Sequence, residues 1–248
     1  MRLKAVNGHP GDHAPWRGAL VVRGVQRSGG ALLDPTGTLS ARLLVEPALR
    51  QACGLDRPTV PVLLTRAQLD QISALIELRH GNPIDLYTTP ALFERLSSAT
   101  AIWPALQERC AMHWRMVPLG GDSHEARFQV EGQRGVTYTA LCAEPETGSE
   151  EPATVLLIGN QASGAQVACV HGTPQDLHAA QAMLDTHWPA VKWLAMVIDE
   201  TADTDAVQWL AAQPVAGKLL LGGDPDLQAW ARPQGVVPAE DGLEIVVE

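Results

Sequence analysis

The chain has 248 residues, of which 46% are hydrophobic and 19% are charged, as is typical of a globular protein able to bury a sizeable core. Its 28 acidic and 18 basic residues give a formal net charge of −10, which argues against a general nucleic-acid-binding role. No apolar run reaches the roughly 18 residues of a membrane-spanning helix, so the sequence predicts no membrane association.

The N-terminal residues lack the apolar stretch of a secretory signal, and the cysteines are too widely spaced to form a zinc-binding cluster. They stand at positions Cys53, Cys110, Cys142 and Cys169. Such spacing favours reduced thiols in a protein core over a disulfide framework. We therefore expect a cytoplasmic protein.

Short apolar runs bounded by glycine or proline dominate the first third of the sequence, a pattern typical of β-strands. Three of these runs are residues 3–6, 19–23 and 60–64, and we expect them to share one sheet. The turn-forming residues 35–37 predict a hairpin between two flanking strands.

The hydrophobic period changes at Thr65. From there apolar residues recur at helical spacing up to a stop signal at residues 81–83, which predicts an amphipathic helix. Thr65 is a favourable N-cap for this helix, and Gln68 stands where the reciprocal side chain of a capping box belongs. A strand at residues 84–87 and a second helix that begins near residue 89 are predicted next.

The second half of the sequence turns back to β-structure and then alternates helices with buried strands. A hairpin is predicted around residues 132–135, and the last helices are predicted near residues 174–187 and 203–213. No internal repeat or interdomain linker interrupts this order, so residues 1–248 are predicted to form a single domain. The second sheet is expected to contain residues 154–158, 166–170, 193–198 and 218–221.

A β-rich half with a pair of helices, followed by a second such half, predicts an α/β (α+β) protein with four layers in the order αββα. A more specific resemblance rests on blocks of sequence that keep their order along nearly the whole chain. The strongest block is residues 63–75, which reads Leu-Leu-Thr-Arg-Ala-Gln-Leu-Asp-Gln-Ile-Ser-Ala-Leu. The other blocks are residues 6–16, 78–90, 170–173, 196–201 and 240–245. Together they resemble the coenzyme PQQ biosynthesis protein B family, which has the metallo-β-lactamase fold.

This resemblance implies a metal site, but the sequence departs from the family pattern at most ligand positions. The superfamily motif HxHxDH, which binds one or two metal ions, corresponds here to Arg66, Gln68, Asp70 and Gln71. Only the aspartate is retained. Two later ligand positions correspond to Gly172 and Gly222, and the cysteine-rich zinc-binding stretch of the family is missing. A conventional dinuclear centre is therefore not expected, and a single zinc or iron ion is the remaining cofactor expectation.

Each residue at the motif has a structural and a functional interpretation. Asp70 is a catalytic base or a lone metal ligand, or else a carboxylate that stabilises the first turn of a helix. Gln68 is a capping residue or, together with Gln71, a weak amide donor in a binding site. Arg66 is an anion-binding guanidinium or a surface arginine at the start of a helix.

Histidines suggest a second arrangement for the same site. His9 and His13 follow the first strand in a loop rich in glycine and proline, which the resemblance places at the mouth of the site. His171 belongs to another loop at this mouth, and with Asp70 these histidines are candidates for a non-standard His/Asp metal site. Asp199 resembles an acidic residue at the edge of the site, or else it caps the turn after its strand.

Three functions from different classes remain open. The first is binding or carrying PQQ or a related small anionic metabolite, with Arg66 and the histidines as ligand contacts. The second is a hydrolytic or oxidative enzyme with an altered mononuclear site. The third is a pseudoenzyme scaffold with a protein partner. Seven tryptophans in a chain with only 4% aromatic residues also leave room for an oligomer interface.

Overall fold

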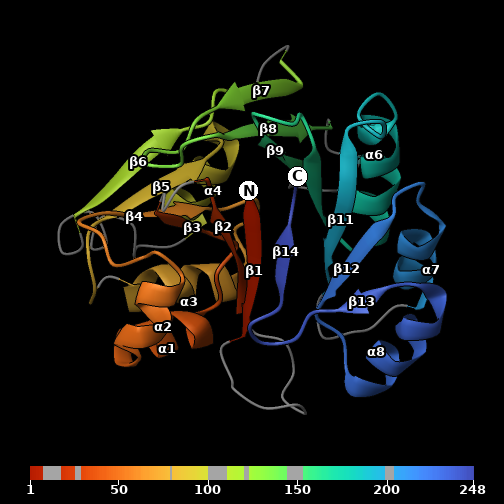
Figure 1. The fold of residues 1–248 in the computed structure, drawn as a ribbon. Coiled ribbons are helices and arrows are strands. Elements are labelled where there is room, and N and C mark those ends of the chain that lie inside the picture. Colours follow the sequence, from red (N-terminus) through yellow and green to blue (C-terminus); the bar gives the residue numbers. More distant parts are fainter. Residues whose placement is uncertain are drawn as a thin grey trace.

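The computed structural model describes residues 1–7, 18–25, 29–78, 80–99, 111–119, 123–143, 153–198 and 204–248. These residues form two seven-stranded sheets that pack face to face, with helices on both outer faces (Figure 1). None of the helices among them is long and apolar enough to cross a membrane.

The first sheet is built mainly by the N-terminal half of the chain and has the strand order β14-β1-β2-β3-β4-β5-β6. The pairs β14–β1, β1–β2 and β2–β3 are antiparallel, whereas β3, β4, β5 and β6 run parallel to one another. The bounds of the strands are β1 Arg2–Asn7, β2 Gly18–Arg23, β3 Gly30–Leu33, β4 Val60–Leu63, β5 Ile84–Thr88, β6 Met112–Met116 and β14 Glu244–Val246.

The second sheet belongs to the C-terminal half and has the order β13-β12-β11-β10-β9-β8-β7. Strands β7 to β10 pair as an antiparallel meander, and β10 to β13 are parallel. The bounds are β7 Glu125–Phe128, β8 Val136–Cys142, β9 Thr154–Asn160, β10 Gln166–His171, β11 Val191–Val197, β12 Gly217–Leu221 and β13 Val237–Pro238.

Helices cover the outer face of each sheet because each helix has one apolar stripe to bury. The first sheet carries α1 Gly37–Val45, α2 Pro47–Ala52, α3 Leu69–Leu78 and α4 Pro90–Ala99 (Figure 1). The second carries α6 Pro174–Leu184, α7 Thr204–Ala212 and α8 Pro225–Ala231, followed by the short 3-10 helix η1 Arg232–Gln234. The predicted αββα sandwich is therefore confirmed.

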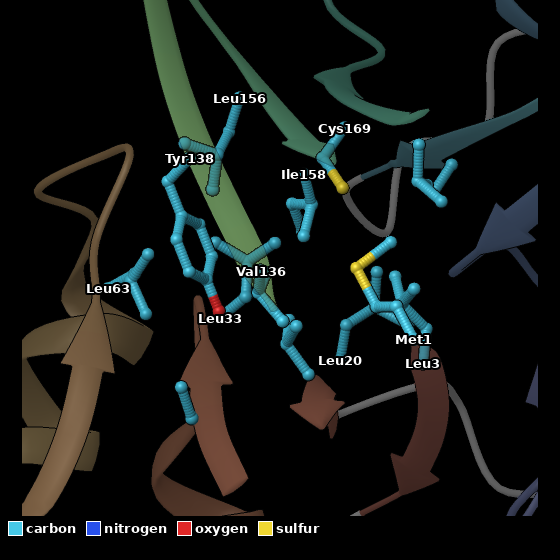
Figure 2. Close-up of a cluster of buried hydrophobic side chains, with 14 of the residues drawn as sticks. Met1, Leu3, Leu20, Leu33, Leu63, Val136, Tyr138, Leu156, Ile158 and Cys169 are labelled. Atoms are coloured by element: carbon cyan, nitrogen blue, oxygen red, sulfur yellow. The ribbon is translucent and has the colours of Figure 1, made fainter. Parts of the chain in front are cut away.

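The apolar core between the two sheets holds them together. Figure 2 shows Leu33 and Leu63 of the first sheet near Tyr138 of the second. In the same view Met1 and Leu3, at the start of the chain, lie on the side of Cys169 from β10. Separate apolar layers lie between each sheet and its own helices. Three such layers are what a four-layer sandwich requires.

Two sequence predictions in the first half are wrong. Residues 35–37 do not form a hairpin, because the Oγ1 of Thr36 accepts a hydrogen bond from the Leu39 N–H at 3.5 Å and caps α1. The predicted helix does not begin at Thr65 but at Leu69, and it is not the first helix of the chain. The side chain of Thr65 is engaged elsewhere, as described below.

Smaller differences from the sequence predictions concern strand β7, the start of α8 and two edge strands. Strand β7 ends at Phe128, before the hairpin loop that was predicted around residues 132–135. Helix α8 was not predicted, and it begins where Asp224 accepts a hydrogen bond from the Leu227 N–H at 2.8 Å. The edge strands β6 and β13 were missed because edge strands are short and carry a weak alternation.

The two tyrosines of the chain offer a test of the core. Tyr138 is fully buried, and its hydroxyl has no hydrogen-bond partner among the described residues. Tyr138→Phe is therefore expected to raise the free energy of unfolding by about 1 kcal/mol. Tyr87→Phe should lower it by a similar amount, because the Tyr87 hydroxyl accepts a hydrogen bond from the Glu131 N–H at 3.0 Å. Urea unfolding measures the free energy of unfolding of both variants. A Tyr138→Phe protein less stable than wild type would contradict the conclusion that the Tyr138 hydroxyl is unpaired.

Candidate functional site

A cavity of about 410 Å³ opens where strands of both sheets end. Its walls come from the last residues of β3, β10, β11 and β12, from the residues that follow β3 and β4, from the start of β2 and from the first turn of α3. Parallel strands bring their carboxyl ends to one edge of a sheet, so this is where both halves of the chain can present polar side chains together.

Asp34 directly follows β3 and lies at the wall of this cavity, with its side chain buried. Its Oδ1 accepts a hydrogen bond from the Thr65 N–H at 2.8 Å, and its Oδ2 accepts one from the Thr65 hydroxyl at 2.6 Å. The backbone of Asp34 has φ 45°, a left-handed conformation that costs energy in a residue with a side chain. The two hydrogen bonds hold the carboxylate in place despite this strain.

His171, the last residue of β10, joins the same group from the second sheet. Its Nε2 lies 2.7 Å from Thr65 Oγ1 and 3.7 Å from Asp34 Oδ2. The single hydroxyl proton of Thr65 is given to Asp34, so Thr65 Oγ1 can only accept a hydrogen bond from His171 Nε2–H. In the neutral ring this leaves Nδ1 without a proton, as an acceptor. The chain Asp34–Thr65–His171 thus links the two sheets at the cavity.

The start of α3 supplies three more polar residues of the wall, namely Gln68, just before the helix, and Asp70 and Gln71 in its first turn. The carbonyl of Gln68 accepts a hydrogen bond from the Ile72 N–H at 3.1 Å, so Gln68 begins the helix through its backbone. Asp70 stands in the first turn, where a carboxylate interacts favourably with the helix dipole. Sequence reasoning singled out all three residues, and the structure places them together at the cavity with His171.

The prediction that Arg66 is a ligand contact has to be corrected. Its guanidinium forms a buried ion pair with Asp176 in the first turn of α6, and both side chains are less than 15% exposed. Asp176 also accepts a hydrogen bond from the Thr173 hydroxyl. Arg66 is not among the described residues that line the cavity, contrary to the expectation that it would. It fastens the segment before α3 to a helix of the other sheet.

The remaining site candidates, His9, His13 and Asp199, lie outside the described residues. Sequence reasoning did not single out Asp34, which precedes the turn predicted at residues 35–37, and it assigned Thr65 to a helix cap. Asp34 follows an apolar run directly, and that position at the end of a buried strand was the signal that could have marked it.

The described side chains do not match the donor set of a dinuclear metal centre. Within the described ranges no three histidine, cysteine, aspartate or glutamate side chains gather where they could hold an ion. A side chain at Gly172 would collide with Ile198, and one at Gly222 would meet the Ile198 carbonyl. Cys169 also lines the cavity, but burial raises the pKa of its thiol and keeps it neutral.

Two helix-flanked sheets, with a polar cavity at their strand ends, define a protein of the metallo-β-lactamase fold. Among solved structures, that of Zn²⁺-bound PqqB from Methylobacterium extorquens is similar, with a TM-score of 0.65 and 16% identity over 99% of this chain and 100% of that one. This chain is thus a metallo-β-lactamase-fold protein similar to coenzyme PQQ synthesis protein B.

The curated relatives support the same assignment over shorter segments. Coenzyme PQQ synthesis protein B of Nitrosococcus oceani is 29% identical over 93 residues, which are 37% of this chain and 30% of that protein. The protein of the same name from Cupriavidus necator is 28% identical over 123 residues, 49% of this chain and 39% of the relative. The matches therefore span well under half of the relatives' length. No protein-family model matches the chain.

Thr65 provides the test of the link between the sheets. Thr65→Val keeps the shape but removes the hydroxyl, so that Asp34 loses a donor and His171 Nε2–H loses its acceptor. We expect the free energy of unfolding to fall by about 2 kcal/mol, while Thr65→Ser stays close to wild type. Thr137→Val is the matched control, since its hydroxyl makes only a 3.4 Å contact with Gly159 O. Equal stability of the Val and Ser variants at position 65 would contradict the link.

Proposed function

We propose that this protein binds PQQ or a related small anionic metabolite in the cavity at the strand ends, without a conventional dinuclear metal centre. The observation that carries the proposal is the cavity itself, at about 410 Å³ and with buried polar groups from both sheets on its wall. Small-molecule sites in proteins have volumes of about 300–1,000 Å³ and a few fixed polar groups. The similarity to PQQ synthesis protein B supports the choice of ligand.

The polar wall suits a ligand that is held by hydrogen bonds rather than by a metal ion. The Asp34 carboxylate accepts two hydrogen bonds from Thr65, so both of its oxygens are engaged before any ligand enters. The amides of Gln68 and Gln71, together with the backbone at the first turn of α3, can receive carboxylate or quinone oxygens. PQQ, a flat tricyclic quinone with three carboxylates, presents such oxygens around its whole rim.

Calorimetric titration of PQQ tests the proposal directly. Val197, the last residue of β11, lines the cavity, and Val197→Phe should fill part of it. We expect PQQ to bind the wild type and the Val197→Phe protein to bind at least about tenfold more weakly. Val237→Phe on β13, at an exposed position away from the cavity, should bind like wild type. No binding to wild type, or equal binding to Val197→Phe, would refute the proposal.

Asp70 separates this proposal from metal-dependent catalysis. Its carboxylate repels the carboxylates of PQQ, so Asp70→Asn should tighten binding by up to about fivefold. A metal-dependent site would instead lose affinity when a ligand carboxylate is removed. The control is Asp226→Asn, which changes the same position in the first turn of α8, outside the cavity wall. Zinc and iron content, measured after purification without chelators, should be below one equivalent; weaker PQQ binding by Asp70→Asn together with stoichiometric metal would favour the enzyme.

A further inference from the structure

Among the described residues that line the cavity, Gln71 has an amide oxygen that is both buried and unpaired. Its side chain is only 5% exposed, and its Oε1 has no hydrogen-bond partner among the described residues. Leaving a buried acceptor unpaired costs about 1–3 kcal/mol, so such groups are rare in folded proteins. Because Gln71 also lines the cavity, a molecule bound there is well placed to supply the missing donor.

Several polar groups that share the cavity wall with Gln71 are acceptors as well. The carboxylates of Asp34 and Asp70 line the same cavity, and in the neutral ring of His171 the bonding of Thr65 leaves Nδ1 as an acceptor. The described lining residues include no lysine or arginine. None of the described residues donates a hydrogen bond to Gln71 Oε1, so a molecule bound in the cavity can supply the donor.

We propose that Gln71 is a specificity-determining residue that accepts a hydrogen bond from a ring N–H of the bound molecule. This inference rests on the proposed function for the place of binding. It adds the chemistry of the part of the bound molecule that contacts Gln71. Gln71 belongs to the first turn of α3, so its position is fixed by the helix and its amide needs little reordering. A flat heteroaromatic carboxylate with an N–H in its ring meets this requirement, and the pyrrole ring of PQQ is of this kind.

Two probes of equal size and charge isolate the N–H. Indole-2-carboxylate has a ring N–H where benzofuran-2-carboxylate has an oxygen, and both are small enough for the cavity. Dissociation constants measured by ligand-observed NMR on the full chain should show that wild type prefers the indole by about fivefold to tenfold, the effect of one hydrogen bond. Gln71→Met should remove this preference. Gln208→Met, at an exposed position on α7, is the matched control and should keep it.

The stability of the unliganded protein gives a second readout. Methionine has nearly the length of glutamine but no acceptor to leave unpaired, so Gln71→Met should raise the midpoint of thermal unfolding while it abolishes the indole preference. Gln71→Leu repeats the test with a different shape. A ratio near one in wild type, a preference that survives in Gln71→Met, or unfolding of both variants below the wild-type midpoint would overturn the inference.

The outcomes for the two proposals can be told apart. If wild type prefers the indole but does not bind PQQ, the role of Gln71 stands and the proposed function fails. If PQQ binding depends on Val197 but the two probes bind equally, or neither binds at millimolar concentration, the proposed function stands and the role of Gln71 fails.

Discussion

The hydrogen bonds from Thr65 to the buried carboxylate of Asp34 are the interaction on which the site depends. They fix the loop after β4, and through His171 they connect that loop to the end of β10 in the other sheet. The left-handed backbone at Asp34 is tolerated because these hydrogen bonds offset its conformational cost. Apolar contacts between the sheets are non-directional and would not by themselves position these polar groups.

The ion pair between Arg66 and Asp176 supports the same junction from outside the cavity. It is mostly buried, so both charges lose hydration, and pairing recovers that loss only if the geometry is kept. Arg66 follows Thr65 directly, which places two cross-sheet attachments on adjacent residues. One segment therefore both joins the two sheets and directs the start of α3 toward the cavity, which Gln68, Asp70 and Gln71 line.

The layer order and most strands could be predicted from sequence because they follow from local hydrophobic periodicity. The group Asp34–Thr65–His171 could not, since its members are 31 and 106 residues apart and each has a common local role, in a turn, a cap or a loop. Thr65 looked like an N-cap because its own sequence neighbourhood fits one, and a tertiary partner overrode that preference. The charge at Arg66 was equally ambiguous, because an arginine at a helix start can serve a ligand or a carboxylate on a distant helix.

Strand β14 gives the sandwich a further property. It comes from the end of the chain, after the second sheet is complete, yet it pairs with β1 at the border of the first sheet. It thereby covers a row of backbone groups on β1 that would otherwise be free to pair with another molecule. The same crossing ties the two halves into one cooperative unit, so that amide hydrogens of β1 and β14 should exchange with solvent together, at a rate set by opening of the whole sandwich rather than by fraying of its last strand.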